Sequence, residues 1–216
     1  MSDRVHVNKI KYRILDCHAE VLLGLRNEST ILDFKEIKNI GAGAYGTIGK
    51  VDHLKTGNTY AIKAIKKKSL SDYLKNTIKK EVEILQESDH PHILKSFDHF
   101  EDEDQVYIVI EYASNGSLYE KLNKSPSKRM SLEQIKPLFG QLVKAVRYLH
   151  GKKIIHRDIK TENILICEYN TLKLIDFGTS NDSNDQRVTK VGTLPYFAPE
   201  LFNEGQVQTN KVDIWC

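Results

Sequence analysis

The chain has 216 residues, of which 40% are hydrophobic and 28% charged, a balance typical of globular proteins that bury a core. No apolar run approaches the roughly 18 residues that a membrane span needs. Cys17, Cys167 and Cys216 are odd in number, far apart in the sequence and in no CxxC pair, which argues against a disulfide framework and a zinc site. The net charge of +3 comes from intermixed acids and bases, which argues against nucleic acid as a partner. Membrane, collagen-like, disulfide-rich and fully disordered proteins are therefore excluded.

The first half of the chain predicts an α+β unit that follows an N-terminal extension, residues 1–33. Short runs rich in β-branched and aromatic residues indicate five strands, at residues 34–40, 47–54, 59–65, 92–100 and 105–113. A helix is expected over residues 71–87, because Ile78, Val82 and Leu85 recur at helical spacing.

The second half predicts mostly helices. A short helix is expected over residues 117–124 and a long one over residues 132–151, where Ser131 and Gln134 form a capping-box pattern. The inward face of the long helix is expected to carry Ile135, Leu138, Leu142, Val146 and Leu149. Short apolar strands are then expected at residues 154–159, 163–167 and 172–177, and the polar segment 180–192 predicts a loop.

A glycine-rich pattern, GAGAYG at residues 41–46, lies between two predicted strands. Glycines allow a tight turn and let backbone N–H groups approach phosphate oxygens. The alternative is an ordinary glycine-rich hairpin. A dinucleotide-binding fold is disfavoured because a strand, not a helix, follows the glycines, and the sequence lacks a Walker-type GxxxxGK[ST] pattern.

A lysine at the end of the third predicted strand can neutralise phosphate charge. That residue is Lys63, and the alternative is that Lys63 is an ordinary surface lysine. Glu81 in the predicted helix is a candidate salt-bridge partner, and Glu83 and Glu87 compete for that role.

Two further patterns place acidic side chains beside loops. HRDIKTEN, at residues 156–163, sets a candidate base, Asp158, five residues before Asn163, whose amide can bind a metal. The alternative is structural, because an aspartate beside an arginine more often forms an ion pair. DFG, at residues 176–178, puts Asp176 at a strand end, where it can hold a divalent cation or simply form a turn.

In this order and at these separations the four patterns resemble the eukaryotic protein kinase family. The resemblance runs from about residue 34 to 216 and includes GTLPYFAPE at 192–200 and DIW at 213–215. It implies a two-lobed α+β fold: an N-lobe, residues 34–113, with a five-stranded antiparallel sheet and one main helix, and a mostly helical C-lobe, residues 114–216. The family domain continues further, so we expect an incomplete C-lobe that exposes Leu138 and Leu142.

The resemblance implies an enzyme that transfers phosphate from ATP, with Mg²⁺, to serine or threonine hydroxyls of protein substrates. Asp158 would accept the hydroxyl proton, and Lys160 would contact the γ-phosphate. Lys63, oriented by Glu81, would hold the α- and β-phosphates. The implied metal ligands are Asn163 and Asp176.

The implied nucleotide site is larger. Ile110 would be the gatekeeper, and the Ile48 side chain stands where the family usually has valine. The ATP-binding residues implied by the resemblance are Ile40, Gly41, Ala42, Gly43, Ala44, Tyr45, Gly46, Ile48, Ala61, Lys63, Ile110, Glu111, Ala113 and Leu165.

Specificity and regulation follow from the same resemblance. Lys160 and Thr193 match serine/threonine kinases, and Thr193 would shape the acceptor site. Thr189 is a candidate activation-loop phosphosite whose phosphate would pair with Arg157, which implies an activating kinase or a regulatory protein. Several motifs favour an Aurora-type or a calcium/calmodulin-kinase-like branch.

A second reading is a truncated, non-catalytic kinase-like fragment that binds nucleotide or a protein partner. The catalytic set favours the enzyme, and the incomplete C-lobe favours the fragment. With no targeting signal recognised, the expected location is the cytoplasm, with the nucleus as alternative, and no membrane or nucleic-acid partner is expected.

Overall fold

The computed structural model describes residues 29–43, 46–183, 191–203 and 207–216. It divides into two compact units. The first, here the β unit, runs up to Tyr73 and includes Ser96–Glu111; the second, the helical unit, consists of Leu74–Lys95 and Tyr112–Cys216. The domain boundaries expected after residues 33 and 113 stay predictions.

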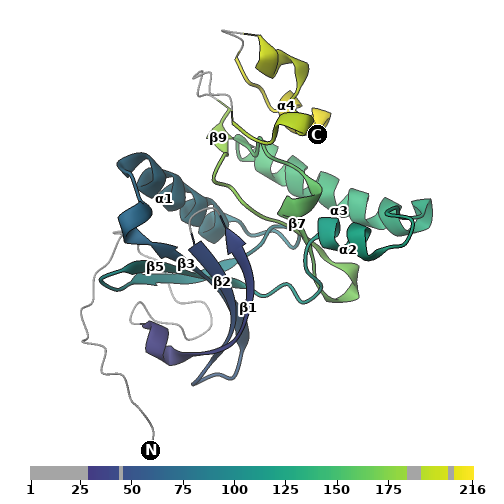
Figure 1. The fold of residues 1–216 in the computed structure, drawn as a ribbon. Coiled ribbons are helices and arrows are strands. Elements are labelled where there is room, and N and C mark those ends of the chain that lie inside the picture. Colours follow the sequence, from purple (N-terminus) through teal and green to yellow (C-terminus); the bar gives the residue numbers. More distant parts are fainter. Residues whose placement is uncertain (1–28, 44–45, 184–190, 204–206) are drawn as a thin grey trace, which may run out of the picture. The chain divides into compact units, whose positions relative to one another are not determined.

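The β unit is one antiparallel sheet with strand order β1-β2-β3-β5-β4, which confirms the predicted five strands. Figure 1 labels β1, β2, β3 and β5 of this sheet. Its strands are β1 (Phe34–Gly43), β2 (Gly46–His53), β3 (Thr59–Lys66), β4 (Ser96–Glu101) and β5 (Gln105–Glu111). The fourth strand is shorter than expected, because Ile93 and Leu94 are buried in the helical unit, where the Leu94 N–H donates to the Leu174 carbonyl at 3.0 Å.

Alternation along the strands decides which side chains form the core of the sheet. One face packs a cluster of buried residues: Phe34, Val51, Tyr60, Ile62, Tyr107 and Val109. Because successive side chains point to opposite faces, Ala61 and Lys63 lie on the other face of β3. The alternation of side chains along each strand thus places the hydrophobic core on one face of the sheet and the predicted ATP-binding residues on the other.

The helical unit contains most of α1 (Asp72–Glu87) and all of α2 (Leu118–Lys124), α3 (Leu132–Gly151) and α4 (Lys211–Trp215). Its strands form two antiparallel pairs, β6 (Ile154–Ile155) with β9 (Asn181–Asp182), and β7 (Ile164–Ile166) with β8 (Leu172–Leu174). The short 3₁₀ helices of the chain are Ile31–Asp33, Lys67–Ser69, Thr161–Asn163, Glu168–Asn170, Leu194–Tyr196 and Pro199–Phe202.

Strand β9 corrects the prediction of a loop over residues 180–192. Asn181 pairs with Ile155 and Asp182 with Ile154. Two polar residues show no periodicity, so only the tertiary pairing reveals this strand.

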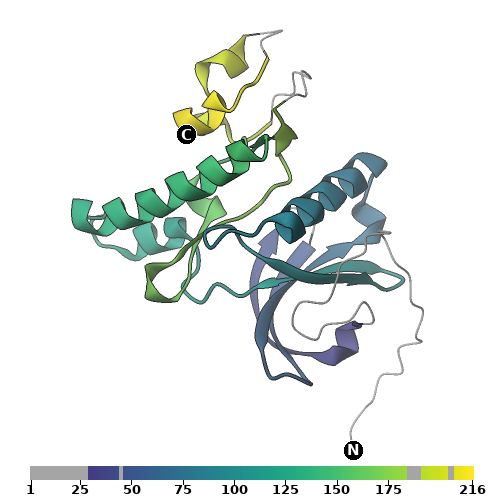
Figure 2. The same cartoon turned by 180° about the vertical axis from the view of Figure 1, so that it is seen from behind.

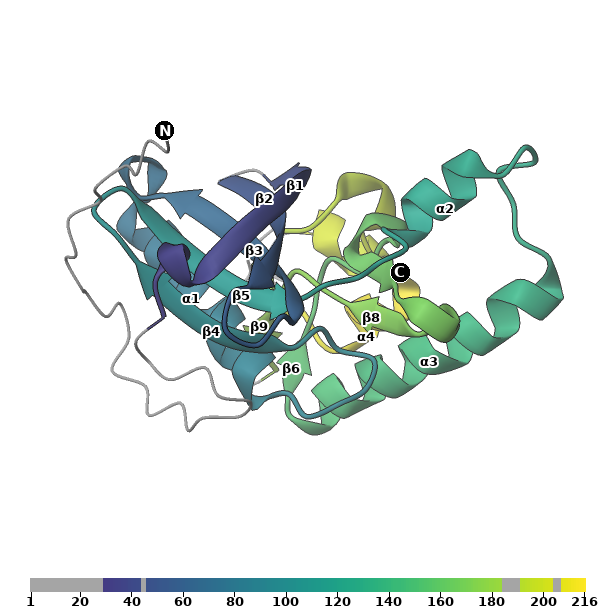
Figure 3. The same cartoon turned by 90° about the horizontal axis from the view of Figure 1, so that it is seen from below.

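Helix α3 begins as its sequence predicts. The Gln134 N–H donates to Ser131 Oγ at 3.3 Å, and the Ser131 N–H donates to Gln134 Oε1 at 3.0 Å, which completes a capping box. The helix contacts β6 and β8, and its length is seen in Figures 2 and 3. Among the described helices none is long and apolar enough to cross a membrane.

The buried face of α3 agrees with the expected one at Leu138, Val146 and Leu149 and differs from it at Ile135. An incomplete C-lobe was expected to expose Leu138 and Leu142, but Leu138 is only 3% exposed and Leu142 is half-buried. Ile135, expected to face inward, is 42% exposed. Apolar residues surround this helix on several sides, so its sequence fits more than one inward face, and packing selects one. The large apolar residues left exposed on it are Leu132, Ile135, Phe139 and Val143.

Candidate active site

A buried carboxylate of α4 holds the segment that follows β6. The Asp213 side chain is fully buried; its Oδ2 accepts the His156 N–H at 2.9 Å, and its Oδ1 accepts the Arg157 N–H at 2.8 Å. His150 Nε2, at the end of α3, lies 2.8 Å from the same Oδ2. A buried charge is tolerated only when it is well hydrogen-bonded, and here these bonds also fix the backbone immediately before Asp158.

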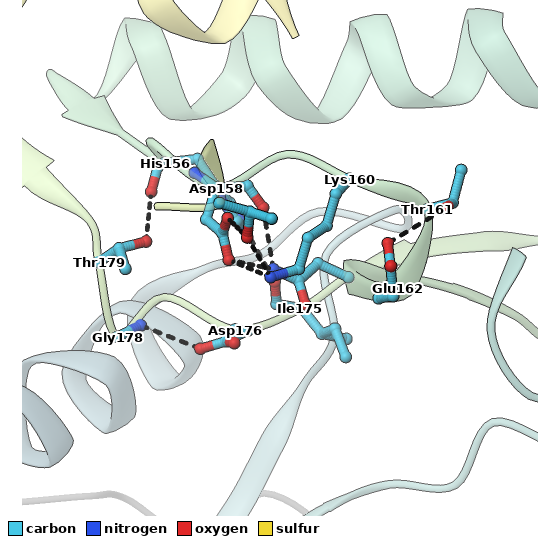
Figure 4. A network of polar contacts seen from close by, with 11 residues as sticks. His156, Asp158, Lys160, Thr161, Glu162, Ile175, Asp176, Gly178 and Thr179 are labelled. Carbon is cyan, nitrogen blue, oxygen red and sulfur yellow. Dashed lines mark hydrogen bonds and ion pairs between the residues drawn. The ribbon is translucent and has the colours of Figure 1, made fainter. Parts of the chain in front are cut away.

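The Asp158 carboxylate is the centre of a polar network (Figure 4). Its Oδ2 accepts hydrogen bonds from Lys160 Nζ at 2.7 Å and Asn163 Nδ2 at 3.0 Å, and its Oδ1 accepts one from Thr193 Oγ1 at 2.6 Å. Lys160 Nζ also donates to Thr193 Oγ1 at 2.7 Å. Three residues from two predicted motifs, HRDIKTEN and GTLPYFAPE, therefore meet at the carboxylate of Asp158.

These contacts set the charge of Asp158. Burial by itself raises the pKa of the carboxyl group, but the hydrogen bonds from Lys160, Thr193 and Asn163, together with the Lys160 charge, outweigh burial and lower the pKa below its ordinary value. The side chain is accordingly an ionised carboxylate at neutral pH.

The His156 ring joins this segment to the one that contains Asp176. Its Nε2 donates to the Ile175 carbonyl at 2.9 Å, its Nδ1 accepts the Asp158 N–H at 3.3 Å, and its ring lies 5.0 Å from the Phe177 ring. Thr179 Oγ1 also donates to the His156 carbonyl at 3.0 Å. The two segments therefore have a common, completely buried anchor.

Asp176 and Asn163 supply the oxygen donors that Mg²⁺ prefers. Asp176 is exposed, and its φ of +66° is a conformation that costs free energy for a residue other than glycine. Asn163 Nδ2 donates to the Asp158 carbonyl at 2.8 Å as well as to its carboxylate, so the amide oxygen is left for another partner. Within the described residues no three or more His, Cys, Asp and Glu side chains form a metal cluster. Two oxygen ligands fit an ion that completes its shell with water and phosphate oxygens.

Arg157 also has a positive φ, +67°, and a fixed side chain. Its Nε donates to the Thr179 carbonyl at 2.6 Å, and its Nη1 donates to Gln208 Oε1 at 3.0 Å. Gly192 lies against the Arg157 backbone with a φ of +108°, and a Cβ there would be 2.5 Å from the Arg157 carbonyl oxygen. Glycine is therefore required at position 192.

In the β unit the strand register brings several predicted ATP-binding residues together. Ile48 lies opposite Lys63, and Ala61 lies opposite Ile110. Since residues directly opposite in an antiparallel pair share a face, all four lie on the face away from the aromatic core. A Cβ at Gly46 would be 1.8 Å from the Ala64 carbonyl oxygen, so this position requires glycine as well.

The remaining predicted residues are placed as follows. Ile40, Gly41, Ala42 and Gly43 lie on β1 and Glu111 on β5, whereas Glu81 lies on α1 and Leu165 on β7, with Ala113 directly after β5. The two groups belong to different units, and the pairing of Lys63 with Glu81 stays a prediction. The predicted residues outside the described part of the chain are Ala44, Tyr45 and Thr189.

Among the residues of this region that were not predicted from sequence are His150 and Lys80. His150 contacts Asp213, and Lys80 of α1 donates to the Ser180 carbonyl at 3.0 Å and to Asn181 Oδ1 at 3.3 Å. The signal for His150 was its place at the end of a predicted helix. Lys80 is one lysine among several, and nothing in the sequence distinguishes it.

Comparison with known proteins agrees with this geometry. The protein kinase domain pattern matches residues 34–216.

The chain belongs to the protein kinase family.

The curated relatives of this kinase domain include Aurora kinases of three yeasts. The chain is 37% identical to the Aurora kinase of Candida glabrata, over 88% of the chain and 53% of the relative. It is 38% identical to the Aurora kinase of Yarrowia lipolytica, over 90% of the chain and 52% of the relative. It is also 38% identical to the Aurora kinase of Schizosaccharomyces pombe, over 82% of the chain and 50% of the relative. The chain thus spans about half the length of these relatives. Their similarity agrees with one of the two branches that the motifs favour.

Proposed function

We propose that this kinase domain transfers the γ-phosphate of ATP to serine and threonine hydroxyls of protein substrates. The observation that carries the proposal is the Asp158 network. An ionised carboxylate is held there by one lysine, one threonine and one amide, each through a hydrogen bond of 3.0 Å or less.

Each member of the network has a role in this proposal. Asp158 accepts the proton of the substrate hydroxyl, since its lowered pKa keeps it ionised at neutral pH. Lys160 bonds to Asp158 and brings a positive charge beside it, which stabilises negative charge that develops on the transferred phosphoryl group. Thr193 binds both side chains and shapes the place where the acceptor hydroxyl lies.

ATP and Mg²⁺ are proposed as cosubstrate and cofactor. Asn163 and Asp176 hold Mg²⁺, which neutralises phosphate charge when bound. Lys63, with Glu81, holds the α- and β-phosphates, and the glycine-rich turn covers them. The face that carries Ile48, Ala61 and Ile110 binds adenine together with Leu165, and the backbones of Glu111 and Ala113 hydrogen-bond it. Protein substrates and an activating kinase are the proposed partners, and the cytoplasm is the proposed location.

The first test is phosphate transfer from radiolabelled Mg-ATP to a general protein substrate. The Asp158→Asn variant should lose about 10²- to 10⁴-fold in rate, because it lacks the base. Glu168→Gln, an exposed acid-to-amide change outside the network, should keep the wild-type rate.

A thermal melt with Mg-ATP separates catalysis from binding. Nucleotide at about 100 times its dissociation constant should stabilise wild type and Asp158→Asn alike, by about 2.7 kcal/mol. If both are stabilised and neither transfers phosphate, the enzyme proposal fails and the nucleotide-binding fragment is the better description.

Regulation by phosphorylation is a further part of the proposal. Two of the hydrogen bonds of the Arg157 side chain go to neutral acceptors, the Thr179 carbonyl and Gln208 Oε1, and a phosphate on Thr189 would offer its guanidinium group a charge-assisted partner. Phosphatase treatment of activated kinase should then lower the activity of the wild type, and Thr189→Ala should have the low activity from the start. A Thr189→Ala variant as active as the phosphorylated wild type would contradict this.

A further inference from the structure

A cavity of about 450 Å³ lies in the helical unit where the loop after α1 meets the end of α3. Its walls contain four residues with basic side chains and no acidic one. The lining residues are His90, Lys144, Arg147, Tyr148, Gly151 and Lys152. None of these residues takes part in the Asp158 network.

The helical repeat brings the cations of α3 together. Lys144, Tyr148 and Lys152 are spaced by four residues, and Arg147 and Gly151 also differ by four, so all five share one side of the last two turns. Within the part of the chain that the structure describes, no carboxylate forms an ion pair with Lys144, Arg147 or Lys152. Cations at a helix end complement its dipole, but this does not account for a cavity or for the ring pair within it.

Two aromatic rings form a fixed wall. The rings of His90 and Tyr148 lie 5.1 Å apart at an angle of 31°, and the Asp89 N–H donates to the Tyr148 hydroxyl at 3.1 Å. The His92 N–H donates to His90 Nδ1 at 3.2 Å. Because Nδ1 accepts this bond, a neutral His90 carries its hydrogen on Nε2 and has one donor left for a ligand.

The cavity has a positive environment. Burial and the charges of His92, Lys173 and Lys144 together lower the pKa of His90 below its ordinary value. Burial and the charges of Lys144 and Lys173 lower that of His92, against the effect of its hydrogen bond to the Leu172 carbonyl. Positive charge from lysine side chains is therefore gathered around the two neutral imidazole rings of His90 and His92.

We propose that this cavity binds the phosphate of a phosphorylated serine or threonine in a protein partner. A phosphate monoester carries about −1.5 to −2 charge at neutral pH and three acceptor oxygens. It therefore matches the three cations of the cavity, Lys144, Arg147 and Lys152, better than a carboxylate with a single charge. Arg147 can bond two oxygens at once through its planar guanidinium group. The open cavity exceeds the volume of a phosphate, and the Tyr148 and His90 rings offer an apolar wall for the neighbouring peptide.

The test uses the whole chain, with Mg-ADP in excess to occupy the nucleotide site. The probe is an alanine peptide with a central phosphoserine, followed by amide NMR signals. Saturable changes are expected at the lining residues, and none with the unphosphorylated peptide. The double variant Lys144→Gln, Arg147→Gln should bind about tenfold more weakly or worse, which corresponds to about 1.4 kcal/mol. The matched double variant Lys124→Gln, Lys136→Gln loses two exposed lysines that do not line the cavity and should bind like wild type.

Several outcomes would overturn the proposal. Inorganic phosphate that binds as tightly as the phosphopeptide would identify a free anion as the ligand. A peptide with glutamate in place of phosphoserine that binds equally well would identify an acidic segment. If the phosphopeptide does not bind, or binds the Lys144→Gln, Arg147→Gln variant as tightly as wild type, the proposal is wrong. The cations would then serve only to complement the dipole at the end of α3. Should the double variant not fold, the exposed single change Lys152→Gln tests the same cavity.

Discussion

The Asp158 carboxylate is acidic because of its neighbours and in spite of its burial. Removal from water favours the neutral acid, whereas Lys160 and Thr193 favour the anion, and their effect is larger. A group with a lowered pKa stays ionised, and stabilises the folded state, until the pH falls through that lowered value. If Asp158 is the base, its protonation should lower the rate of phosphate transfer only at acidic pH, below its lowered pKa.

Thr193→Val removes the 2.6 Å hydrogen bond to Asp158 Oδ1 and keeps the shape of the side chain. A hydrogen bond to a charged group contributes about 1.5–3 kcal/mol, so its loss should raise the pKa of Asp158. The acid limb of kcat/KM should therefore move to higher pH, which a pH–rate profile measures. Thr193→Ser keeps the hydroxyl, so the acid limb of its kcat/KM profile should stay at the wild-type pH. Identical pH–rate profiles for Thr193→Val and wild type would refute a role for this hydrogen bond.

At the scale of elements, the side chain of Lys80 connects helix α1 to strand β9. Lys80 Nζ bonds to the Ser180 carbonyl and to Asn181 Oδ1, a few residues after Asp176. Asn181 also pairs with Ile155 of β6, two residues before Arg157. The helix, the Asp176 segment and the Asp158 segment are thus connected within one unit.

Lys80→Met should loosen this connection and lower kcat about tenfold, because a hydrogen bond from a charged group contributes about 1.5 kcal/mol or more. The neighbouring Lys79 pairs with Glu83 at 3.9 Å and is half-exposed, so Lys79→Met is the matched control and should behave like wild type. Steady-state kinetics with varied ATP compares them. Equal loss in both variants would point to a general effect of charge.

At the scale of the whole molecule, packing separates apolar residues that look equivalent in sequence. Leu138 is 3% exposed and its neighbour Phe139 is 62% exposed. Trp215, the single tryptophan, lies in the same unit, so its fluorescence follows the unfolding of this region.

Leu138→Ala should lower the free energy of unfolding by about 2–5 kcal/mol, since it opens a cavity in the core. Phe139→Ala should change it by less than about 0.5 kcal/mol, since the ring is mostly in water. Urea denaturation followed by Trp215 fluorescence measures both. A large loss for Phe139→Ala would mean that this ring is covered in solution.

The sequence by itself determined the five strands of the β unit, the helix bounds at Ser131 and Gly151, and the motif residues, because periodicity, capping and glycine-rich turns are local properties. Asp158, Lys160, Asn163 and Thr193 could be predicted as site residues because their motifs resemble those of protein kinases, and the structure adds that the last three donate hydrogen bonds to the Asp158 carboxylate.

Only the tertiary structure decided the inward face of α3, the pairing of β9, the contact of Lys80, and the cavity between His90 and the end of α3. Each depends on residues far apart in the chain, such as Lys80 and Ser180 or Asp89 and Tyr148. A local pattern carries no information about such partners, since their proximity arises only when separate elements pack together.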